Sequence, residues 1–283
     1  MPPWFRNSRP VVTWAGWSNH RSKFWTLHYR GKLMRAYVGF DDTDTVEADR
    51  GTGKLARWFE HELPDGCTMV GVVRQQLLVC DDIPYTSHNS SACMMVEMPD
   101  PASLQALVDG AARHVERHAL EGSDPGLCVV TDGDPALSQL TAFGRRCTSV
   151  VVTQKEALQA ACRAHLSGHG GTNGGIIGAA AAVGLTASGW CGRFIEFGGL
   201  RRFPEVVRVG DLEQAGFLVV SMDRDARVPG PDELIVTKGW LRPRLWGGRA
   251  VVGVAPNGNG LWESLGERRR KRQEHEDHLS GAR

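Results

Sequence analysis

The chain of 283 residues carries 33 Lys and Arg, 32 Asp and Glu, and 41% hydrophobic residues. This composition is typical of a soluble globular protein with one large or two modest domains, and no apolar run approaches the roughly 20 residues of a membrane-spanning helix. The net charge of +1 is uneven: residues 1–33 contribute +6 and residues 263–283 contribute +1, which leaves −6 for residues 34–262. Such an acidic body gives no support to a broad nucleic-acid-binding face, which needs a basic surface.

Seven cysteines are scattered along the chain, and none forms a C-x-x-C pair. Their odd number and spacing argue for a reducing compartment, hence a cytoplasmic location, and against a zinc site. Residues 1–33 hold four of the nine tryptophans and show no sustained period. We expect them to be a disordered extension or the product of an upstream start codon, because Met34 directly precedes the first predicted strand.

The first predicted strand, residues 36–40, ends at three carboxylates in four residues, Asp41, Asp42 and Asp44. Like charges repel and their burial is costly, so a fold that gathers them usually supplies a cation. All-oxygen ligands suit Mg²⁺, which typically brings substrate phosphates with it. We therefore predict that these three aspartates bind a metal ion and are catalytic.

A glycine-flanked loop follows the acidic turn, with Thr52 between two glycines and Lys54 beside it. The loop leads into a predicted helix over 54–63. This succession of strand, acidic turn, loop and helix is typical of a phosphate-binding site, because free backbone amides at a loop and a helix start attract anions. The pattern predicts nucleotide contacts from Thr43, Gly51 and Lys54. A solvated Asp/Thr turn followed by an N-capped helix stays open as an equal alternative.

The next part of the chain alternates strands with helices, which predicts an α/β or α+β layered fold. We predict strands at 68–73, 93–98, 126–130 and 148–152, and helices at 103–120, 137–143 and 154–166; residues 77–79 form a shorter apolar run. The uncharged loop 83–92 is rich in hydroxyl and amide groups that can hydrogen-bond phosphate or ribose. Asn89 and Ser90 are therefore candidate nucleotide contacts, with a plain surface loop as the alternative.

A second glycine-rich stretch, residues 168–175, leads directly into a helix of small residues over 176–184. Bare backbone of this kind approaches ligands closely, and a helix start faces anions well. The predicted nucleotide contacts here are Gly171, Thr172, Gly174 and Gly175. The stretch satisfies neither the G-x-G-x-x-G pattern after a strand nor the G-x-x-x-x-G-K-[ST] loop. Further strands are predicted at 189–197, 217–222, 234–236 and 251–254.

Several of these motifs resemble one known family. GFDDTDT followed by GTGKLA is similar to a G-[IV]-D-D-T-D-S turn and a C-T-T-Y-L-A-like segment, and residues 174–184 follow a G-x-G-x-x-G-L-I-G-A-L-A-A-I-G-like segment. Thr86, Asn89 and Ala92 fall on a P-x-K-T-R-G-N-G-A-like loop whose basic and glycine positions differ in this chain. Over residues 34–255 the sequence resembles the archaeal agmatidine synthetases that modify an isoleucine tRNA.

The resemblance implies an ATP-using kinase-like α/β domain at 34–199 and a ferredoxin-like or accessory α+β region at 200–262. A charged tail would follow at 263–283, without the family's OB-fold and zinc ribbon. It also implies that ATP and Mg²⁺ serve to phosphorylate the 2-carbonyl of the wobble cytidine, and that agmatine then displaces the phosphate. Thr52 falls on a threonine that the family phosphorylates on itself.

Three hypotheses follow. The first is an ATP-dependent kinase or ligase acting on a small amine or another phosphoacceptor. The second is the same chemistry on tRNA, with a partner protein supplying RNA binding. The third is a nucleotide-binding regulator that has no chemistry of its own. In the first two, metal-bound phosphates and positioning do most of the catalytic work.

Overall fold

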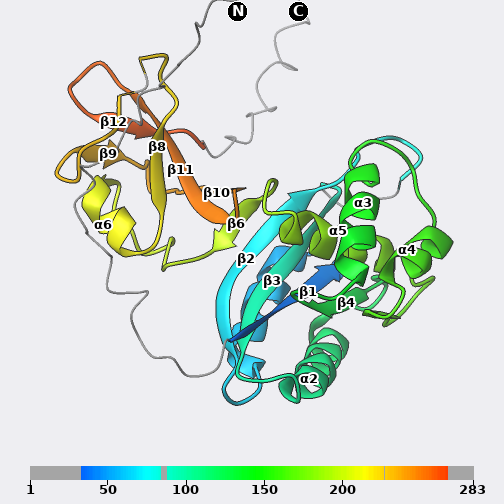
Figure 1. Ribbon diagram of the computed structural model, residues 1–283. Coiled ribbons are helices and arrows are strands. Elements are labelled where there is room, and N and C mark those ends of the chain that lie inside the picture. Colours follow the sequence, from blue (N-terminus) through cyan, green and yellow to red (C-terminus); the bar gives the residue numbers. More distant parts are fainter. Residues whose placement is uncertain (1–32, 84–87, 226, 267–283) are drawn as a thin grey trace, which may run out of the picture. The chain divides into compact units, whose positions relative to one another are not determined.

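The computed structural model describes residues 33–83, 88–225 and 227–266 of the chain (Figure 1). The predictions for residues 1–32, for residues 84–87 of the polar loop, and for the charged tail after Gly266 lie outside the described residues. The mixed α/β class predicted from the sequence is confirmed. No helix among the described residues is long and apolar enough to cross a membrane.

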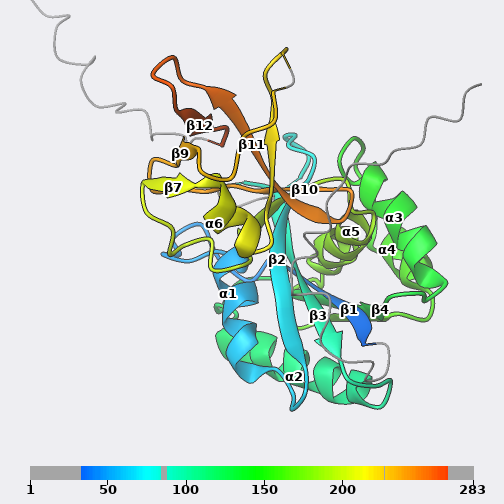
Figure 2. The same cartoon turned by 60° about the vertical axis from the view of Figure 1, so that its left-hand side comes forward.

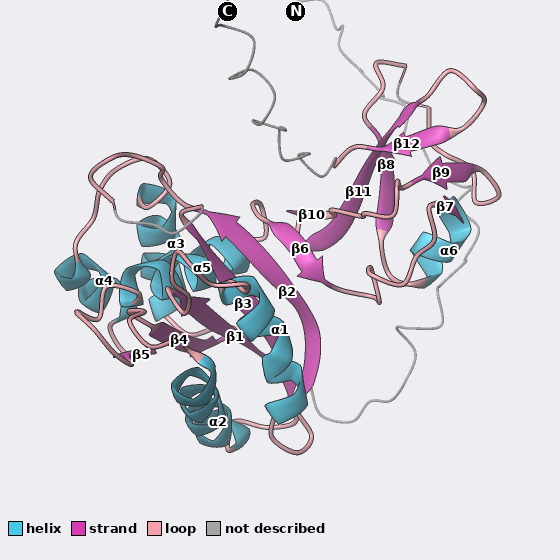
Figure 3. Cartoon of the chain, turned by 180° about the vertical axis from the view of Figure 1, so that it is seen from behind, coloured by secondary structure: helices cyan, strands magenta, loops and turns pink. Residues whose placement is uncertain are grey.

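The described residues contribute twelve strands to one sheet, and helices cover parts of it (Figures 1 and 3). The strands are β1 (Met34–Asp41), β2 (Thr68–Gln76), β3 (Ser90–Met98), β4 (Gly126–Thr131), β5 (His165–Gly168), β6 (Arg193–Glu196), β7 (Val206–Arg208), β8 (Leu218–Ser221), β9 (Leu234–Val236), β10 (Arg244–Trp246), β11 (Arg249–Pro256) and β12 (Trp262–Ser264). The helices are α1 (Thr52–Trp58), the 3₁₀ turn η2 (Phe59–Glu62), α2 (Ser103–His118), α3 (Ala136–Arg146), α4 (Gln154–Ala161), α5 (Ile176–Ala187) and α6 (Val209–Gln214).

The strand order is β5-β4-β1-β3-β2-β6-β10-β11-β12-β9-β7, and β8 pairs with β11 in parallel. The first half of the chain builds the part of the sheet that helices α1 to α5 cover (Figure 2), and the second half continues the sheet from β6 into β10, both labelled in Figure 1. Strand β1 lies between β3 and β4 and is antiparallel to both. The strand that ends in the acidic turn is therefore held on both sides.

Strand β1 buries both of its faces, which explains its continuous apolar run. Ala36, Val38 and Phe40 pack into a core with α1, η2 and α2. Tyr37 packs into a second core with α3, α4 and α5. Because side chains alternate along a strand, Asp41 points to the same face as Tyr37, toward α5.

Helix α5 lies unusually close to the sheet because small residues meet there. A Cβ atom added at Gly39 of β1 would overlap the carbonyl of Ala179, and one added at Gly126 of β4 would overlap the backbone of Gly175. This close packing brings the start of α5 directly over the end of β1.

One predicted strand, at residues 148–152, is wrong, and the short apolar run at 77–79 forms no strand either. Residues 77–79 leave the sheet after β2, and the backbone N–H groups of Leu77 and Leu78 donate to Asn89 and Cys147 in loops. Residues 148–152 form a turn and coil in which Val150 and Val151 are 44% and 52% exposed. Their β-branched composition suggested a strand, but these apolar side chains face solvent.

Other predicted helix and strand boundaries differ from the observed ones because of the backbone geometry. The helix predicted over 154–166 ends at Ala161, because Cys162 adopts a positive φ of 47°, and residues 165–168 become strand β5. The strand predicted over 189–197 is confined to β6, since Gly189 and Gly192 have φ of 73° and 93°. Strands β7, β10 and β12 were not predicted; each has only three residues, too few for a periodic signal.

Candidate functional site

The acidic turn begins with Asp41 at the end of β1. The Asp41 side chain packs against the first turn of α5. A Cβ at Gly178 would overlap the Asp41 carboxylate, so only a glycine at that helix position leaves room for it. Burial, and after it the neighbouring Asp42 carboxylate, raises the pKa of Asp41 to about 8. Burial, and after it the charges of Asp124 and Asp44, raises the pKa of Asp42 to about 6. These carboxylates are crowded and poorly solvated, which favours a bound cation.

Asp124 is a fourth acid of this cluster and was not among the predicted site residues. Its backbone N–H donates to the Asp42 carbonyl at 3.2 Å. Its Oδ2 accepts a hydrogen bond from the Thr172 hydroxyl, whereas its Oδ1 is buried without a hydrogen-bond partner. The available signal was the Asp-Pro-Gly turn directly before the predicted strand at 126–130.

The predicted glycine loop wraps around Asp124. A Cβ at Gly171 would lie 2.9 Å from Asp124 Oδ1, and one at Gly174 would lie 3.0 Å from Oδ2. The Gly175 N–H donates to the Asp124 carbonyl at 3.0 Å. Gly171, Thr172, Gly174 and Gly175 are therefore brought to the acidic turn, as one would expect if both belong to a single site, although their contact with a nucleotide stays a prediction.

Thr52 lies at the other side of the turn, at the first position of α1. Its hydroxyl donates to Asp44 Oδ1 at 3.2 Å, and its oxygen accepts from the backbone N–H and the hydroxyl of Thr43 at 3.3 and 3.1 Å. Gly51 is the N-cap residue of α1, which has no side-chain capping bond. The Thr52 hydroxyl therefore does not cap the helix and instead makes its hydrogen bonds within the acidic turn.

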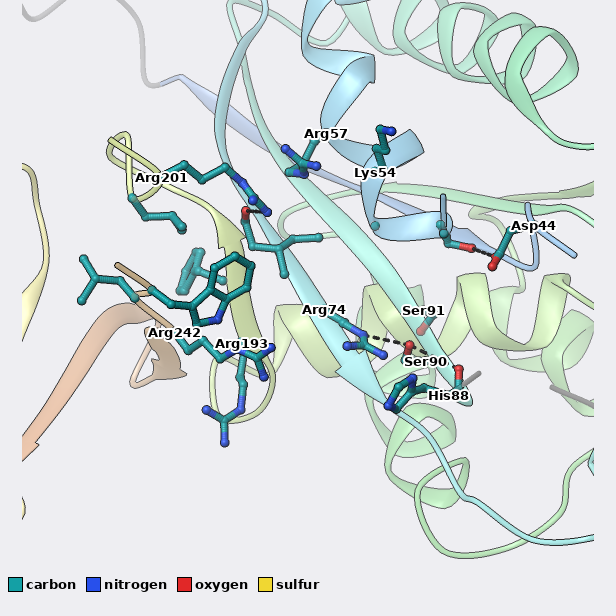
Figure 4. A pocket seen from close by; sticks show the side chains of 18 residues that line it. Asp44, Lys54, Arg57, Arg74, His88, Ser90, Ser91, Arg193, Arg201 and Arg242 are labelled. Carbon is teal, nitrogen blue, oxygen red and sulfur yellow. Dashed lines mark hydrogen bonds between the residues drawn. The ribbon is translucent and has the colours of Figure 1, made fainter. Parts of the chain in front are cut away.

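A pocket opens beside Thr52 (Figure 4). Five predicted site residues line it: Asp44, Gly51, Thr52, Lys54 and Ser90. The remaining lining residues were not predicted: Gly53, Arg57, Arg74, His88, Ser91, Arg193, Phe194, Ile195, Leu200, Arg201, Trp240, Leu241 and Arg242. The pocket thus has one acidic residue and six Lys or Arg side chains, so it is suited to an anionic ligand.

The arginines of the pocket perturb one another. Burial lowers the pKa of Arg74, and the guanidinium of Arg242 lowers it further. The pKa of Arg57 is lowered first by burial and then by Arg201. The pKa of Arg193 is also lowered, first by burial and then by Arg244 and Arg242. An anion bound among these cations would relieve the repulsion, which is a physical reason for the pocket to bind phosphate groups.

Ser90 and Asn89 were predicted together but differ in the structure. Ser90 lines the pocket and accepts a hydrogen bond from Arg74 Nε at 2.9 Å, drawn in Figure 4. The Asn89 side chain donates to the Leu78 carbonyl at 2.5 Å, within the connection from β2 to β3, and Asn89 is not among the pocket-lining residues. Its role in nucleotide binding stays a prediction.

The donor set of the acidic turn fits Mg²⁺. Asp41, Asp42, Asp44 and Asp124 offer only oxygen atoms, and the buried Oδ1 of Asp124 lacks a partner. Among the described residues, the only group of three or more side chains whose ligand atoms all lie within 4.8 Å is a different one, Glu62, His114 and His118. The aspartates therefore suit an ion held by one or two carboxylates together with substrate phosphates and water, the usual arrangement for Mg²⁺.

Comparison with known proteins gives a partial result. No protein-family model matches the chain, and no curated protein matches it by sequence. Among solved structures, a tRNA fluorescent labeling enzyme and the complex of TiaS with an isoleucine tRNA and ATP are each 30% identical to this chain, with a TM-score of 0.46. A TiaS complex with tRNA, AMPCPP and agmatine is 29% identical, with a TM-score of 0.44. TiaS is a tRNA agmatidine synthetase. Each match covers 53% of this chain and only 36% of the matched chain.

Proposed function

We propose that the chain is an ATP- and Mg²⁺-dependent enzyme of the agmatidine-synthetase type, which transfers a phosphoryl group from ATP. The observation that carries the proposal is the position of Thr52. Its hydroxyl donates to Asp44 at 3.2 Å and lies between an acidic cluster and a pocket lined by six cationic side chains. The motif resemblance at the acidic turn and at the glycine loop supports the same reaction.

The two sides of the site have complementary tasks in this proposal. Arg74, Arg193 and Arg242 bind the phosphate oxygens, because guanidinium groups match phosphate geometry in a bidentate manner. One or two carboxylates of the acidic turn, from Asp41, Asp42 and Asp44, would hold Mg²⁺, which, when bound, neutralises charge on the transferred phosphoryl group. Phosphoryl transfer depends mainly on positioning and charge stabilisation, and this site offers both.

Thr52 is the proposed acceptor of the phosphoryl group. The hydroxyl oxygen forms a bond to the γ-phosphorus, the bond from that phosphorus to the β,γ-bridging oxygen breaks, and ADP leaves. The hydroxyl proton passes to Asp44, whose Oδ1 already accepts the hydrogen bond. Lys54 and Arg57 line the same pocket and stabilise the phosphothreonine once it is formed.

The proposed second substrate is an RNA or a small molecule that is phosphorylated, after which an amine such as agmatine forms a bond to it and phosphate leaves. The charge of the pocket supports a polyanionic substrate, although a nucleotide alone would satisfy it. Agmatine and tRNA are the compounds to test first, because a matched TiaS structure contains both.

The test is an assay with γ-labelled ATP and Mg²⁺ on the full chain in three arms: protein alone, protein with total tRNA, and protein with agmatine. We expect ATP turnover, with label on the protein in the first arm. Stimulation by tRNA assigns RNA as the substrate, and stimulation by agmatine alone assigns a small-molecule reaction. Binding of ATP without turnover in any arm would contradict the proposal and favour a nucleotide-binding regulator.

A further inference from the structure

A second cluster of ligand-type side chains lies away from the pocket, where η2 meets α2. Glu62 at the end of η2 faces His114 and His118, which are one helical turn apart on α2. The Glu62 Oε1 atom is 3.0 Å from His114 Nδ1 and 3.0 Å from His118 Nε2. All three ligand atoms lie within 4.8 Å of one another. Two imidazoles and one carboxylate thus converge on one point.

His114 gives an independent indication that a ligand belongs there. Its side chain is 0% exposed, and its Nε2 is 3.0 Å from the Leu55 carbonyl. A carbonyl only accepts, so Nε2 carries the hydrogen and donates it. In the neutral ring, Nδ1 then directs its lone pair toward the Glu62 carboxylate, and Nδ1 has no hydrogen-bond partner of acceptable geometry. A buried lone pair facing a carboxylate oxygen is repulsive unless a proton or a metal cation lies between them.

The surroundings resemble the outer shell of a metal centre. Metal-binding histidines usually donate their second ring N–H to a carbonyl or carboxylate, as His114 does to Leu55. The second carboxylate oxygen of Glu62, Oε2, accepts from Arg117 Nη1 at 3.3 Å, which leaves Oε1 directed at the histidines. Phe40 and Phe59 pack against the His114 ring and shield that side. The ring positions are therefore fixed by packing and by hydrogen bonds.

We propose that His114 Nδ1, His118 Nε2 and Glu62 Oε1 bind one divalent transition-metal ion of the zinc class. Metal–nitrogen and metal–oxygen bonds of about 2.0–2.2 Å in a tetrahedral site separate neighbouring ligand atoms by roughly 3.3 Å. The two separations of 3.0 Å to Glu62 Oε1 are close to that value. Two imidazoles with one carboxylate favour Zn²⁺ and similar ions over Mg²⁺.

The site is open on one side. The side chains of His118 and Glu62 are 28% and 26% exposed, whereas His114 is fully buried. A fourth ligand, such as water, has access from solvent, as in three-ligand zinc sites. The earlier expectation of no zinc site rested on the cysteines alone, and it did not consider the H-x-x-x-H spacing of α2, which places both rings on one helix face.

The experiment is a titration of the full chain, stripped with EDTA and kept reduced, with Zn²⁺ by calorimetry and with Co²⁺ by visible absorption. The site variant is His118→Gln, because this half-buried position tolerates a polar side chain better than the fully buried His114 does. The matched control is His61→Gln, which removes an exposed histidine adjacent to Glu62. Melting curves in EDTA confirm that both variants are folded.

We expect one equivalent of metal with nitrogen- and oxygen-type Co²⁺ bands in the wild type and in His61→Gln. His118→Gln should weaken the affinity by at least about tenfold, since even loss of an outer-shell partner costs about that much. Glu62→Gln should weaken it as well. Equal affinity in His118→Gln, thiolate-type Co²⁺ bands from the cysteines, or no uptake by the wild type would each overturn the proposal. The last outcome would leave the cluster as an ion pair of Glu62 with protonated histidines.

Discussion

The acidic turn and the basic pocket meet at Thr52, but they are assembled in opposite ways. The acids come from a local motif, since Asp41, Asp42 and Asp44 lie within four residues. The cations come from distant parts of the chain, from Lys54 on α1 to Arg242 before β10. Each side alone is electrostatically unfavourable, as the raised pKa of Asp41 and the lowered pKa of Arg74 indicate. A ligand that combines a metal ion with phosphate groups would relieve both sides at once.

The largest expected effect concerns the residue at which the two sides meet. Incubation with Mg-ATP should add one phosphate to the wild type and to Thr52→Ser, and none to Thr52→Val, because valine has the shape of threonine without the hydroxyl. Intact-mass measurement decides this. Thr45→Val is the control, as it removes a hydroxyl of the same turn. A phosphate that persists in Thr52→Val would move the acceptor to Thr43, Thr45 or Ser90.

The acidic side should control turnover. Asp44→Asn keeps the size of the side chain but removes both the charge and the proton acceptor of Thr52, so ATP turnover should fall on the order of 100-fold. Asp49→Asn makes the same chemical change at an exposed position of the same loop and should retain the wild-type rate. Equal rates for the two variants would remove Asp44 from the chemistry.

The basic side should control nucleotide affinity instead. Arg193→Gln removes one charge-assisted hydrogen bond to phosphate and should weaken ATP binding by about tenfold, both with Mg²⁺ and in EDTA. Arg244→Gln is the matched control, because Arg244 is the strand partner of Arg193 but is not among the pocket-lining residues. If Arg193→Gln binds ATP as tightly as the control, the phosphates lie elsewhere.

The smallest effect is on the stability of the metal-free protein. The pKa of Asp41 is raised from 3.8 to about 8, so between these pH values the folded state binds more protons than the unfolded state. The free energy of unfolding should therefore fall as the pH rises through this window. The Asp41→Asn variant should lose less of its free energy of unfolding as the pH rises. The melting temperature of this variant in EDTA should therefore exceed that of the wild type by a few degrees near pH 8. Parallel curves for the two proteins would show that Asp41 is not the group that titrates.

The contrast between the two sides also explains what the sequence could predict. Asp41 to Asp44 and the glycine stretch around Gly174 are contiguous, and each has a physical signature in the sequence. Arg74, Arg193 and Arg242 meet only because β2, β6 and the segment before β10 come together, and no local pattern marks them. The net charge of −6 over residues 34–262 concealed them further. Asp124 could have been predicted as a site residue, because it belongs to an Asp-Pro-Gly turn directly before a predicted strand.

The same distinction holds for the fold. Strands β1 and β3 and helices α2 and α5 were predicted because burial gives them long, regular patterns. The strand predicted at 148–152 failed because β-branched residues alone do not provide a partner strand, and tertiary pairing decides strand formation. The three-residue strands of the second half depend on that pairing almost entirely.

The most direct test of a combined metal and phosphate site is a calorimetric titration of the wild-type chain with ATP, in Mg²⁺ and again in EDTA. If the acidic turn and the basic pocket bind one Mg-ATP between them, the affinity should fall by at least about tenfold when Mg²⁺ is removed, since both the carboxylates and the phosphates then lose their shared cation. Equal affinity in the two buffers would mean that the aspartates take no part in nucleotide binding, and it would contradict the account.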